Sequence, residues 1–296
     1  MSKLNLLITG SSGQLGVQLK KISPNFPNFN FFFKDKIELD ITNFSSVENF
    51  VRKYKIDVLI NCAAYTNVDL AEEQKELVNL INNVSVGFLA KICSENKIQL
   101  IHISTDFVFD GNKKFPYNED DITNPLNFYG LSKLNGEKQI LKNSNLKKSL
   151  IIRTSWLYCE SKNNFVSKII SKILANENIM VVKDQFGSPT RTKDLALAIL
   201  KIIPKIKNLN TEIFHFCNEG YCSKLNLANH INLILKGKSK IIPVETTNTI
   251  ILRPKFSSLD TSKFKDKFDF EINDWKKSLM NYFIDSDIKN FNRNEL

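Results

Sequence analysis

Short apolar runs alternate with helical patterns through the first half of the chain, and this alternation constrains the fold more than any other feature. Continuous apolar runs indicate strands that are buried on both faces. They occupy residues 4–9, 29–33, 58–61, 99–104 and 150–154. Helical spacing marks residues 14–22, 44–54, 70–94 and 129–141. This β-α-β order predicts an α/β fold with a Rossmann-type, doubly wound parallel sheet.

The alternation loosens after Thr154, where a smaller part of the chain begins. Helices are predicted at residues 165–175, 195–203, 225–235 and 275–284. Strands are predicted at residues 179–182, 213–217 and 240–243, with a turn at residues 185–190. We therefore expect a sheet domain over residues 1–158 and a smaller α/β lobe over residues 159–296. Some segments of this lobe can return to the first domain.

Length and composition are those of a folded, soluble protein. Of the 296 residues, 42% are hydrophobic and 24% are charged, which excludes a disordered or fibrous chain. No apolar run approaches the ~20 residues of a membrane-spanning helix. Residues 1–9 run straight into a glycine-rich turn, so they indicate a first strand and not a signal peptide. The five cysteines include no CxxC pair, which favours the reducing cytoplasm.

The chain carries 41 basic and 31 acidic residues, which gives a net charge of +10. Such a charge can indicate nucleic-acid binding, because clustered lysines release counterions from phosphates. The lysines are instead spread among asparagines and acids, without a basic run. We therefore expect neither a nucleic-acid nor a membrane partner, and only a modest attraction to small anionic ligands.

A glycine-rich turn follows the first strand directly. Gly10, Gly13 and Gly16 span this turn and the start of the next helix, and Gln14 and Leu15 lie between them. Glycines let the backbone turn sharply and approach a pyrophosphate, whose charge the free N–H groups of a helix N-terminus stabilise. Because strand, turn and helix follow in this order, the five residues are candidates for binding a dinucleotide cofactor.

The ends of the second and third strands supply further candidates for cofactor binding. A dinucleotide site needs a carboxylate for ribose hydroxyls or a cation for a 2′-phosphate at the end of the second strand. Lys34 and Asp35 offer both, so the choice between NADH and NADPH stays open. The remaining candidates are Asp40, Ile41, Ala63, Ala64 and Tyr65. The small alanines would let a flat cofactor lie against the backbone, although packing explains them equally well.

Polar side chains at the end of the fourth strand and at the start of the next helix carry the chemistry. Ser104, Thr105 and Asp106 lie at the carboxyl edge, where open α/β sheets bind ligands. Tyr129 and Lys133 stand four residues apart, so they project from one helix face. An ammonium beside a phenol favours the phenolate, so we expect a lowered pKa for Tyr129 and proton exchange near neutral pH. The Thr105 hydroxyl can bind the same substrate oxygen.

Together these motifs resemble the extended short-chain dehydrogenase/reductases and, over nearly the whole chain, the dTDP-4-dehydrorhamnose reductase family. Further matching motifs occupy residues 61–69, 104–111, 124–133, 153–158, 184–190 and 253–254. The resemblance implies an NAD(P)H-dependent oxidoreductase that reduces the C4 ketone of dTDP-4-dehydro-L-rhamnose, in nucleotide-sugar synthesis for cell-surface polysaccharide. It also implies that residues 1–158 bind the dinucleotide and that residues 159–296 mainly bind the substrate.

The resemblance also assigns roles to individual residues. Thr105, Tyr129 and Lys133 form the implied catalytic set, in which Tyr129 supplies a proton to the ketone oxygen. Lys133 holds the ribose of the cofactor and tunes Tyr129. The implied substrate-binding residues are Val68, Thr105, Asp106, Tyr129, Trp156 and Arg253. Arg253 is a candidate for the diphosphate because its fork suits paired oxygens, yet a surface ion pair for Arg253 and a core position for Trp156 are equally open.

Two positions distinguish related functions. Dehydratases that resemble this family carry an Asp-Glu pair after the threonine, whereas this chain has Asp106 and Phe107, which favours reduction over elimination of water. Some family members form a magnesium-bridged dimer through glutamates, but Lys193 replaces a hard oxygen ligand here. We therefore predict no metal site, and a homodimer of another kind stays open. Core or near-core positions are expected for His102, His215 and His230, which lack ligand spacing.

Two other functions stay open. The chain could reduce another nucleotide-linked 4-keto-6-deoxy sugar, because one sequence does not reveal which residues select the sugar. It could also be a non-catalytic subunit that binds a dinucleotide to regulate a partner. The intact set of Thr105, Tyr129 and Lys133 argues against that second function.

Overall fold

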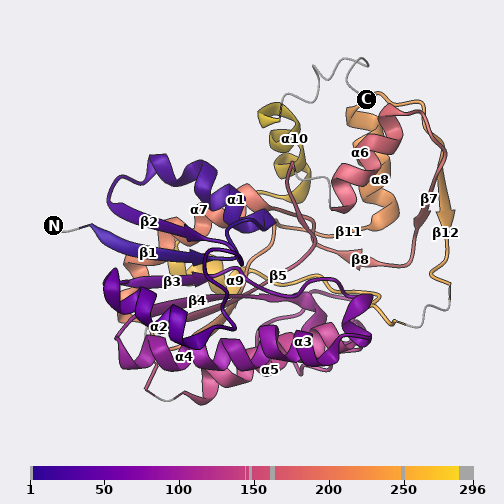
Figure 1. The fold of residues 1–296 in the computed structure, drawn as a ribbon. Coiled ribbons are helices and arrows are strands. Elements are labelled where there is room, and N and C mark those ends of the chain that lie inside the picture. The colour runs from indigo at the N-terminus through magenta and orange to yellow at the C-terminus, as the bar shows by residue number, and fades with distance from the viewer. Residues whose placement is uncertain (1–2, 144, 147–148, 161–163, 248–250, 287–296) are drawn as a thin grey trace.

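Six parallel strands form the large sheet that the sequence predicts (Figure 1). The computed structural model describes residues 3–143, 145–146, 149–160, 164–247 and 251–286. In spatial order the strands are β10 (Glu212–His215), β5 (Leu150–Thr154), β4 (Gln99–Thr105), β3 (Val58–Asn61), β1 (Leu4–Thr9) and β2 (Phe29–Lys34). Because β1 pairs with β2 on one side and with β3 on the other, the winding reverses there. In doubly wound sheets, ligands bind at the carboxyl ends of the strands beside this reversal.

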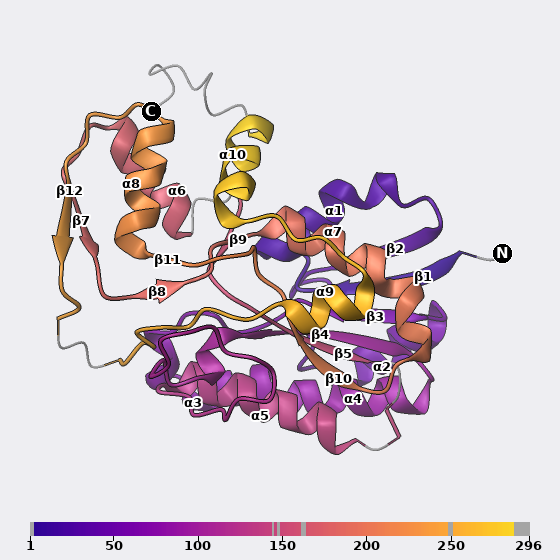
Figure 2. The same ribbon diagram turned by 180° about the vertical axis from the view of Figure 1, so that it is seen from behind.

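Helices cover both faces of the sheet (Figure 2). One layer contains α1 (Gln14–Ile22), α7 (Thr192–Ile202) and α9 (Ser262–Phe268), and the other contains α2 (Phe44–Lys53), α4 (Ser85–Glu95) and α5 (Phe128–Lys142). Successive strand residues point to opposite faces, so Leu6 and Ile8 pack into the first core and Leu7 into the second. The near-continuous apolar strands of the sequence are explained by this burial on two faces.

The helical segment predicted at residues 70–94 is interrupted. It comprises a 3₁₀ turn at Leu70–Glu72, α3 (Lys75–Asn79), a π-helical turn at Leu80–Val84 and then α4. By length and composition alone, the stretch Lys75–Glu95 could cross a membrane. In this fold, however, α4 buries Leu89 and Ile92 in the core beneath the sheet. Packing on the sheet therefore accounts for its apolar composition.

The smaller lobe is built from short elements around its own apolar core. Its helices are α6 (Phe165–Leu174), α8 (Lys224–Ile234) and α10 (Trp275–Asp285). Its strands form three pairs: parallel β7 (Ile179–Val182) with β12 (Ile241–Val244), parallel β6 (Leu157–Tyr158) with β9 (Thr190–Arg191), and antiparallel β8 (Phe186–Gly187) with β11 (Cys222–Ser223). Trp275 and Tyr282 from α10 pack against this core.

The chain returns twice from the smaller lobe to the sheet. β10 adds to the sheet beside β5, while α7 packs against α1 and α9 packs against β10. These are segments of the range 159–296 that lie with the large sheet. α9 was not predicted, because its lysines give the sequence a polar appearance although Phe264 and Phe268 are buried. The division at residue 158 remains a prediction.

Candidate active site

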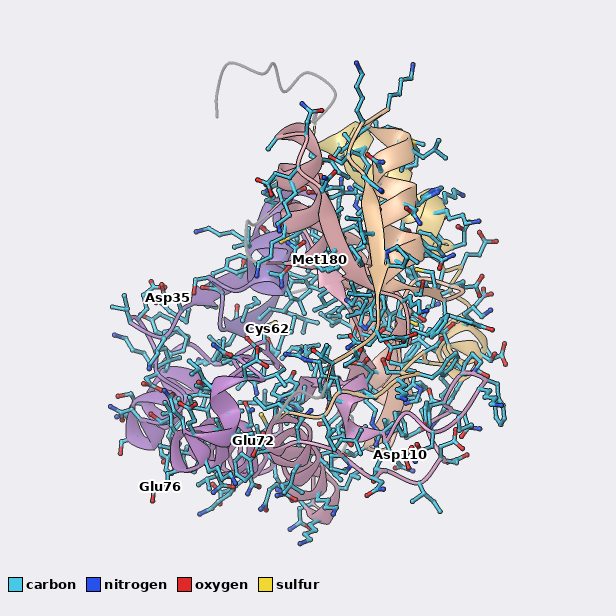
Figure 3. The ribbon with its side chains drawn as sticks, turned by 90° about the vertical axis from the view of Figure 1, so that its right-hand side faces the viewer. Asp35, Cys62, Glu72, Glu76, Asp110 and Met180 are labelled. Atoms are coloured by element: carbon cyan, nitrogen blue, oxygen red, sulfur yellow. The ribbon has the colours of Figure 1, made fainter. Side chains whose placement is uncertain are left out.

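A cleft of about 660 Å³ lies where the carboxyl ends of the strands face the smaller lobe. Figure 3 shows Cys62, at the end of β3, between the two parts, whereas Asp35 lies at the periphery. The predicted site residues that line the cleft are Gly13, Gln14, Leu15, Ala64, Val68, Thr105, Asp106, Tyr129, Lys133, Trp156 and Arg253. The fold therefore brings together residues that are far apart in the sequence.

The glycine turn is closely packed and presents the N-terminus of α1 to this cleft. Gly10 has a φ of +64°, and a Cβ added there would lie 2.6 Å from the backbone nitrogen of Ala63. A Cβ on Gly16 would lie 2.5 Å from the Cα of Ser11. No side chain of the described residues caps the start of α1, which leaves backbone N–H groups beside Gly13 for an anion. This arrangement fits the pyrophosphate of a dinucleotide.

Several predicted cofactor residues do not form the described cleft wall and have partners of their own. Lys34 forms an ion pair with Glu38 at 3.1 Å, and Asp40 accepts hydrogen bonds from the backbone and hydroxyl of Thr42. The Tyr65 hydroxyl donates to Gln74 Oε1. Ile41 is a core residue, and Gly10, Gly16 and Ala63 serve the packing of the turn. Contact of these residues with a cofactor remains a prediction.

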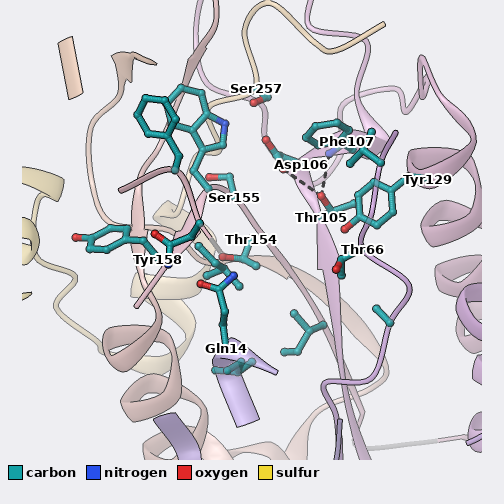
Figure 4. A pocket seen from close by; sticks show the side chains of 18 of the residues that line it. Gln14, Thr66, Thr105, Asp106, Phe107, Tyr129, Thr154, Ser155, Tyr158 and Ser257 are labelled. Atoms are coloured by element: carbon teal, nitrogen blue, oxygen red, sulfur yellow. Dashed lines mark hydrogen bonds between the residues drawn. The ribbon is translucent and has the colours of Figure 1, made fainter. Parts of the chain in front are cut away.

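Tyr129 lies beside the end of β4 (Figure 4). The side chain of Asn127 caps α5 by accepting a hydrogen bond from Gly130 N, and the Tyr129 ring packs edge-on against Phe107. Burial raises the pKa of Tyr129 to about 12, although a hydrogen bond with Thr105 acts in the opposite direction. The predicted lowering of this pKa by Lys133 is therefore wrong for this structure. Its phenol stays protonated at neutral pH, as a proton donor requires.

Lys133 does not act on the phenol because its ammonium group is engaged elsewhere. Lys133 is 2% exposed, and its Nζ lies 2.6 Å from the Ile103 carbonyl oxygen and 3.2 Å from His102 Nε2. Burial lowers the pKa of Lys133 to about 8. A buried lysine with neutral partners is unusual in proteins, because charge is costly to remove from water.

A chain of hydrogen bonds continues from Lys133 into the sheet. Asn61 Oδ1 accepts from the Thr9 hydroxyl at 2.7 Å, so Asn61 Nδ2 faces His102 Nδ1 at 3.0 Å. An amide nitrogen can only donate, which makes Nδ1 the acceptor and leaves the proton of the neutral ring on Nε2, facing Lys133. A proton on Nε2 disfavours the charged form of Lys133. Burial disfavours the same form, so both effects lower the pKa of Lys133. The predicted core position of His102 is confirmed, but its contact with Lys133 was missed.

Asn82, in the π-helical turn, is a second residue that sequence reasoning missed. It is fully buried, and its side chain accepts from Tyr65 N at 2.9 Å and donates to Tyr65 O and to the Ser132 hydroxyl. Ser132 in turn donates to the Tyr129 carbonyl oxygen. Asn82 thus joins the loop after β3 to the first turn of α5. The only signal in the sequence is a polar residue within an apolar helical segment.

The predicted substrate residues lie around the cleft, with Asp106 on the side of Tyr129. Asp106 is buried beside Thr105, whose hydroxyl donates to Asp106 Oδ1, and burial raises the pKa of Asp106 to about 6. Trp156 adopts a positive φ of 42°, and its indole is so close to Gly187 that a Cβ there would lie 2.5 Å away. Arg253 lines the cleft and also pairs with Asp69 at 2.5 Å. The ion pair that the sequence left open for Arg253 is thus present, and its contact with a diphosphate remains a prediction.

The positions discussed for a metal lie outside this cleft. Lys193 forms an ion pair with Asp285 at 2.5 Å. His215 is buried, as predicted, with Nε2 at 3.4 Å from Arg153, and the partly buried His230 packs against the Trp275 ring. Within the described ranges, no group of His, Cys, Asp or Glu could hold a metal ion. The oligomeric state remains a prediction.

Fold and site together define a class: a Rossmann-type α/β protein with a nucleotide-sized cleft at the carboxyl edge of its sheet. The chain belongs to the RmlD substrate binding domain family, whose model matches residues 4–287. The predicted fold class and family are thereby confirmed.

Three known proteins show how far this similarity extends. The dTDP-4-dehydrorhamnose reductase of Aggregatibacter actinomycetemcomitans is 37% identical over 288 residues, which cover 93% of this chain and 97% of that protein. The dTDP-4-dehydrorhamnose reductase of Bacillus anthracis, solved in complex with NADP, is 35% identical with a TM-score of 0.90 and covers 96% of this chain and 99% of its own. The dTDP-4-keto-6-deoxy-D-glucose reductase of Streptomyces niveus is 31% identical over 280 residues, 94% of this chain and 96% of that protein.

Proposed function

We propose that this chain is a cytoplasmic, NAD(P)H-dependent oxidoreductase that reduces the C4 ketone of dTDP-4-dehydro-L-rhamnose to give dTDP-L-rhamnose. The observation that carries this proposal is the meeting of Thr105, Tyr129 and Lys133 in one cleft of a chain from this family. The relatives named dTDP-4-dehydrorhamnose reductase support the substrate. The NADP in the Bacillus anthracis structure favours NADPH, with NADH as the alternative. The product is a precursor for cell-surface polysaccharide.

In the proposed mechanism, the bound cofactor supplies a hydride to C4 of the sugar. Tyr129 donates its phenolic proton to the ketone oxygen, so that one hydride and one proton convert the ketone into the alcohol. The Thr105 hydroxyl donates a hydrogen bond to the same oxygen and orients it. Lys133 binds the ribose of the cofactor. Because Tyr129 is a partly buried phenol of raised pKa, it is ready to act as an acid at neutral pH.

The remaining predicted residues position the two ligands. Gly13, Gln14 and Leu15 hold the pyrophosphate of the cofactor at the start of α1. Val68, Asp106 and Trp156 surround the sugar, and Arg253 binds the diphosphate of the substrate. The sheet domain therefore binds mainly the cofactor, while the lobe formed by α6, α8 and α10 closes the substrate side of the cleft.

The direct test mixes the purified protein, NADPH and dTDP-4-dehydro-L-rhamnose and follows the absorbance of the reduced nicotinamide. Tyr129→Phe is the matched control, because it keeps the ring and removes the proton donor. We expect a rate loss of about a hundredfold or more in this variant. Wild-type protein that binds NADPH but oxidises it no faster than Tyr129→Phe would contradict the proposal.

A second candidate function is the reduction of a different dTDP-linked 4-keto-6-deoxy sugar. The similarity to the dTDP-4-keto-6-deoxy-D-glucose reductase of Streptomyces niveus favours it as the alternative. The chemistry at Tyr129 would be the same, and only the fit of the sugar against Val68 and Trp156 would differ. Offering both keto-sugars at equal concentration and identifying the products separates the two functions.

A further inference from the structure

Lys224 lies in the cleft wall in a position that neither the motifs nor the mechanism above explains. It is the first residue of α8, where its backbone N–H donates to the Gln185 carbonyl oxygen at 3.0 Å. Its side chain is partly buried, and Nζ lies 3.5 Å from the centre of the Trp156 ring and 4.5 Å from that of Phe165. The ammonium is therefore held between two aromatic side chains that line the same cleft.

The charges of the cleft wall are out of balance. Among the described lining residues, one carboxylate, Asp106, accompanies three cations, Lys133, Lys224 and Arg253. Arg253 pairs with Asp69, and Lys133 donates to a carbonyl. Within the described part of the chain, the Lys224 ammonium forms no hydrogen bond or ion pair, only its two ring contacts. Ring faces attract a cation but replace its lost hydration only in part, so an anion from a ligand would complete the site.

We propose that Lys224 binds the diphosphate of the nucleotide-sugar substrate, together with Arg253; this rests on the proposed function. Lys224 and Arg253 both line the cleft, and Gln185, whose carbonyl oxygen accepts from the Lys224 backbone, lines an adjoining pocket together with Arg253, so both cations lie at the same end of the cleft. The glycine turn, where the cofactor pyrophosphate is expected, belongs to the other wall. An anion at Lys224 would also hold the ammonium against Trp156, so the same contact would fix the indole beside the sugar.

A consequence of this position is that diphosphate binding changes the protonation of Lys224. Burial lowers the pKa of Lys224 to about 7, while Asp106 and Cys222 act to raise it and Arg253 acts to lower it. At pH 8 most of the free Lys224 is therefore neutral. A bound diphosphate stabilises the charged form, so binding at pH 8 takes up close to one proton. Lys133 and Asp106 also have pKa values near neutral pH, at about 8 and about 6. The part of the proton uptake that belongs to Lys224 is therefore measured by changing Lys224 alone.

The test measures binding of dTDP to the full-length protein by calorimetry. Lys224→Met should weaken dTDP binding about tenfold or more, whereas Lys224→Arg keeps the charge and should retain most of the affinity. The matched control is Lys276→Met, because Lys276 also contacts a tryptophan ring, Trp275, at 5.7 Å but lies outside the described cleft. NADPH affinity should be unchanged in all three variants.

Proton uptake provides a second measurement. Comparing two buffers of different ionisation enthalpy at pH 8, we expect uptake near one proton for the wild type and a clear decrease for Lys224→Arg, which stays charged. If Lys224→Met also loses NADPH binding, its fold is damaged and the proton uptake of Lys224→Arg decides. Unchanged dTDP affinity in Lys224→Met, or unchanged proton uptake in Lys224→Arg, overturns this proposal. The wild-type protein would still reduce a keto-sugar in that case. Failure of the proposed function instead appears as wild-type protein that reduces neither keto-sugar.

Discussion

Two groups of buried charges in this molecule have opposite surroundings. Glu137 and Arg153, at most 3% exposed, form a two-pronged ion pair with distances of 2.9 and 2.7 Å, and the Ser104 hydroxyl completes it. Lys133 and Lys224, in the cleft wall, have no carboxylate within ion-pair distance among the described residues. An unpaired buried charge is costly. The paired charges of the first group therefore hold structural elements together, whereas the cations of the second group remain able to bind an anionic or polar ligand.

The ion pair lies directly behind the residues of the proposed mechanism. Glu137 is on α5, one turn beyond Lys133, and Arg153 is on β5, whose neighbour β4 ends at Thr105. Arg153 also approaches His215 of β10 at 3.4 Å, and burial together with Arg153 lowers the pKa of His215 to about 3. The pair thus joins one helix and three strands, and it fixes the frame on which Thr105 and Tyr129 are held.

Arg153→Met should produce the largest effect, because it leaves Glu137 buried without its partner. We expect the free energy of unfolding to fall by about 3–5 kcal/mol. Denaturant unfolding of the wild type and the variant measures this loss. Adding Glu137→Leu to the variant should recover part of it, since no unpaired carboxylate then remains. A loss below about 1 kcal/mol in Arg153→Met would remove the distinction between the two charge groups.

Lys133→Met is the corresponding change in the cleft, and its effect should be on rate. We expect kcat/KM to fall about a hundredfold, because the contact that positions the ribose of the cofactor is lost. The free energy of unfolding at pH 7 should stay within about 1 kcal/mol of the wild type, because a desolvated ammonium is removed along with its hydrogen bond to the Ile103 carbonyl oxygen. A loss of stability as large as that of Arg153→Met would show that Lys133 is a structural charge.

The pH dependence of stability sharpens the same comparison. The pKa of Lys133 is about 8 in the folded protein and ordinarily about 10.5. Between these values the unfolded chain binds a proton that the folded protein has released, so the free energy of unfolding rises with pH. Between pH 7.5 and pH 9.5, the free energy of unfolding of the wild type should therefore rise by roughly 1–2 kcal/mol relative to that of Lys133→Met. A difference that is constant with pH would contradict the lowered pKa.

The parts of the fold that sequence reasoning predicted well are those with one dominant cause. β1, β3 and β5 have the predicted bounds, because an uninterrupted apolar run between polar turns leaves little choice of strand ends. Thr105, Tyr129 and Lys133 meet as predicted, because the carboxyl ends of parallel strands lie at one edge of a sheet.

The missed features depend on distances that no local pattern contains. The pKa of Tyr129 was predicted with the wrong sign, because the sequence shows the neighbouring lysine but not the burial or the carbonyl that engages it. Lys224 looks like a surface lysine until α8 is placed against Trp156. Likewise, only the packing of α5 against the sheet reveals that Glu137 and Arg153 are partners.

The smallest effect is expected where an exposed acid competes with the proposed ligand for a cleft cation. Asp69 is 67% exposed on its side chain and pairs with Arg253, so Asp69→Asn should change the free energy of unfolding by less than about 1 kcal/mol. With this competitor removed, dTDP should bind up to about threefold more tightly, and the gain should shrink as salt is added. Glu48→Gln is the matched control, because it removes the same charge from the Arg52–Glu48 pair on α2. Equal dTDP affinity in both variants at low salt would exclude Arg253 from the diphosphate site and leave Lys224 as its proposed cation.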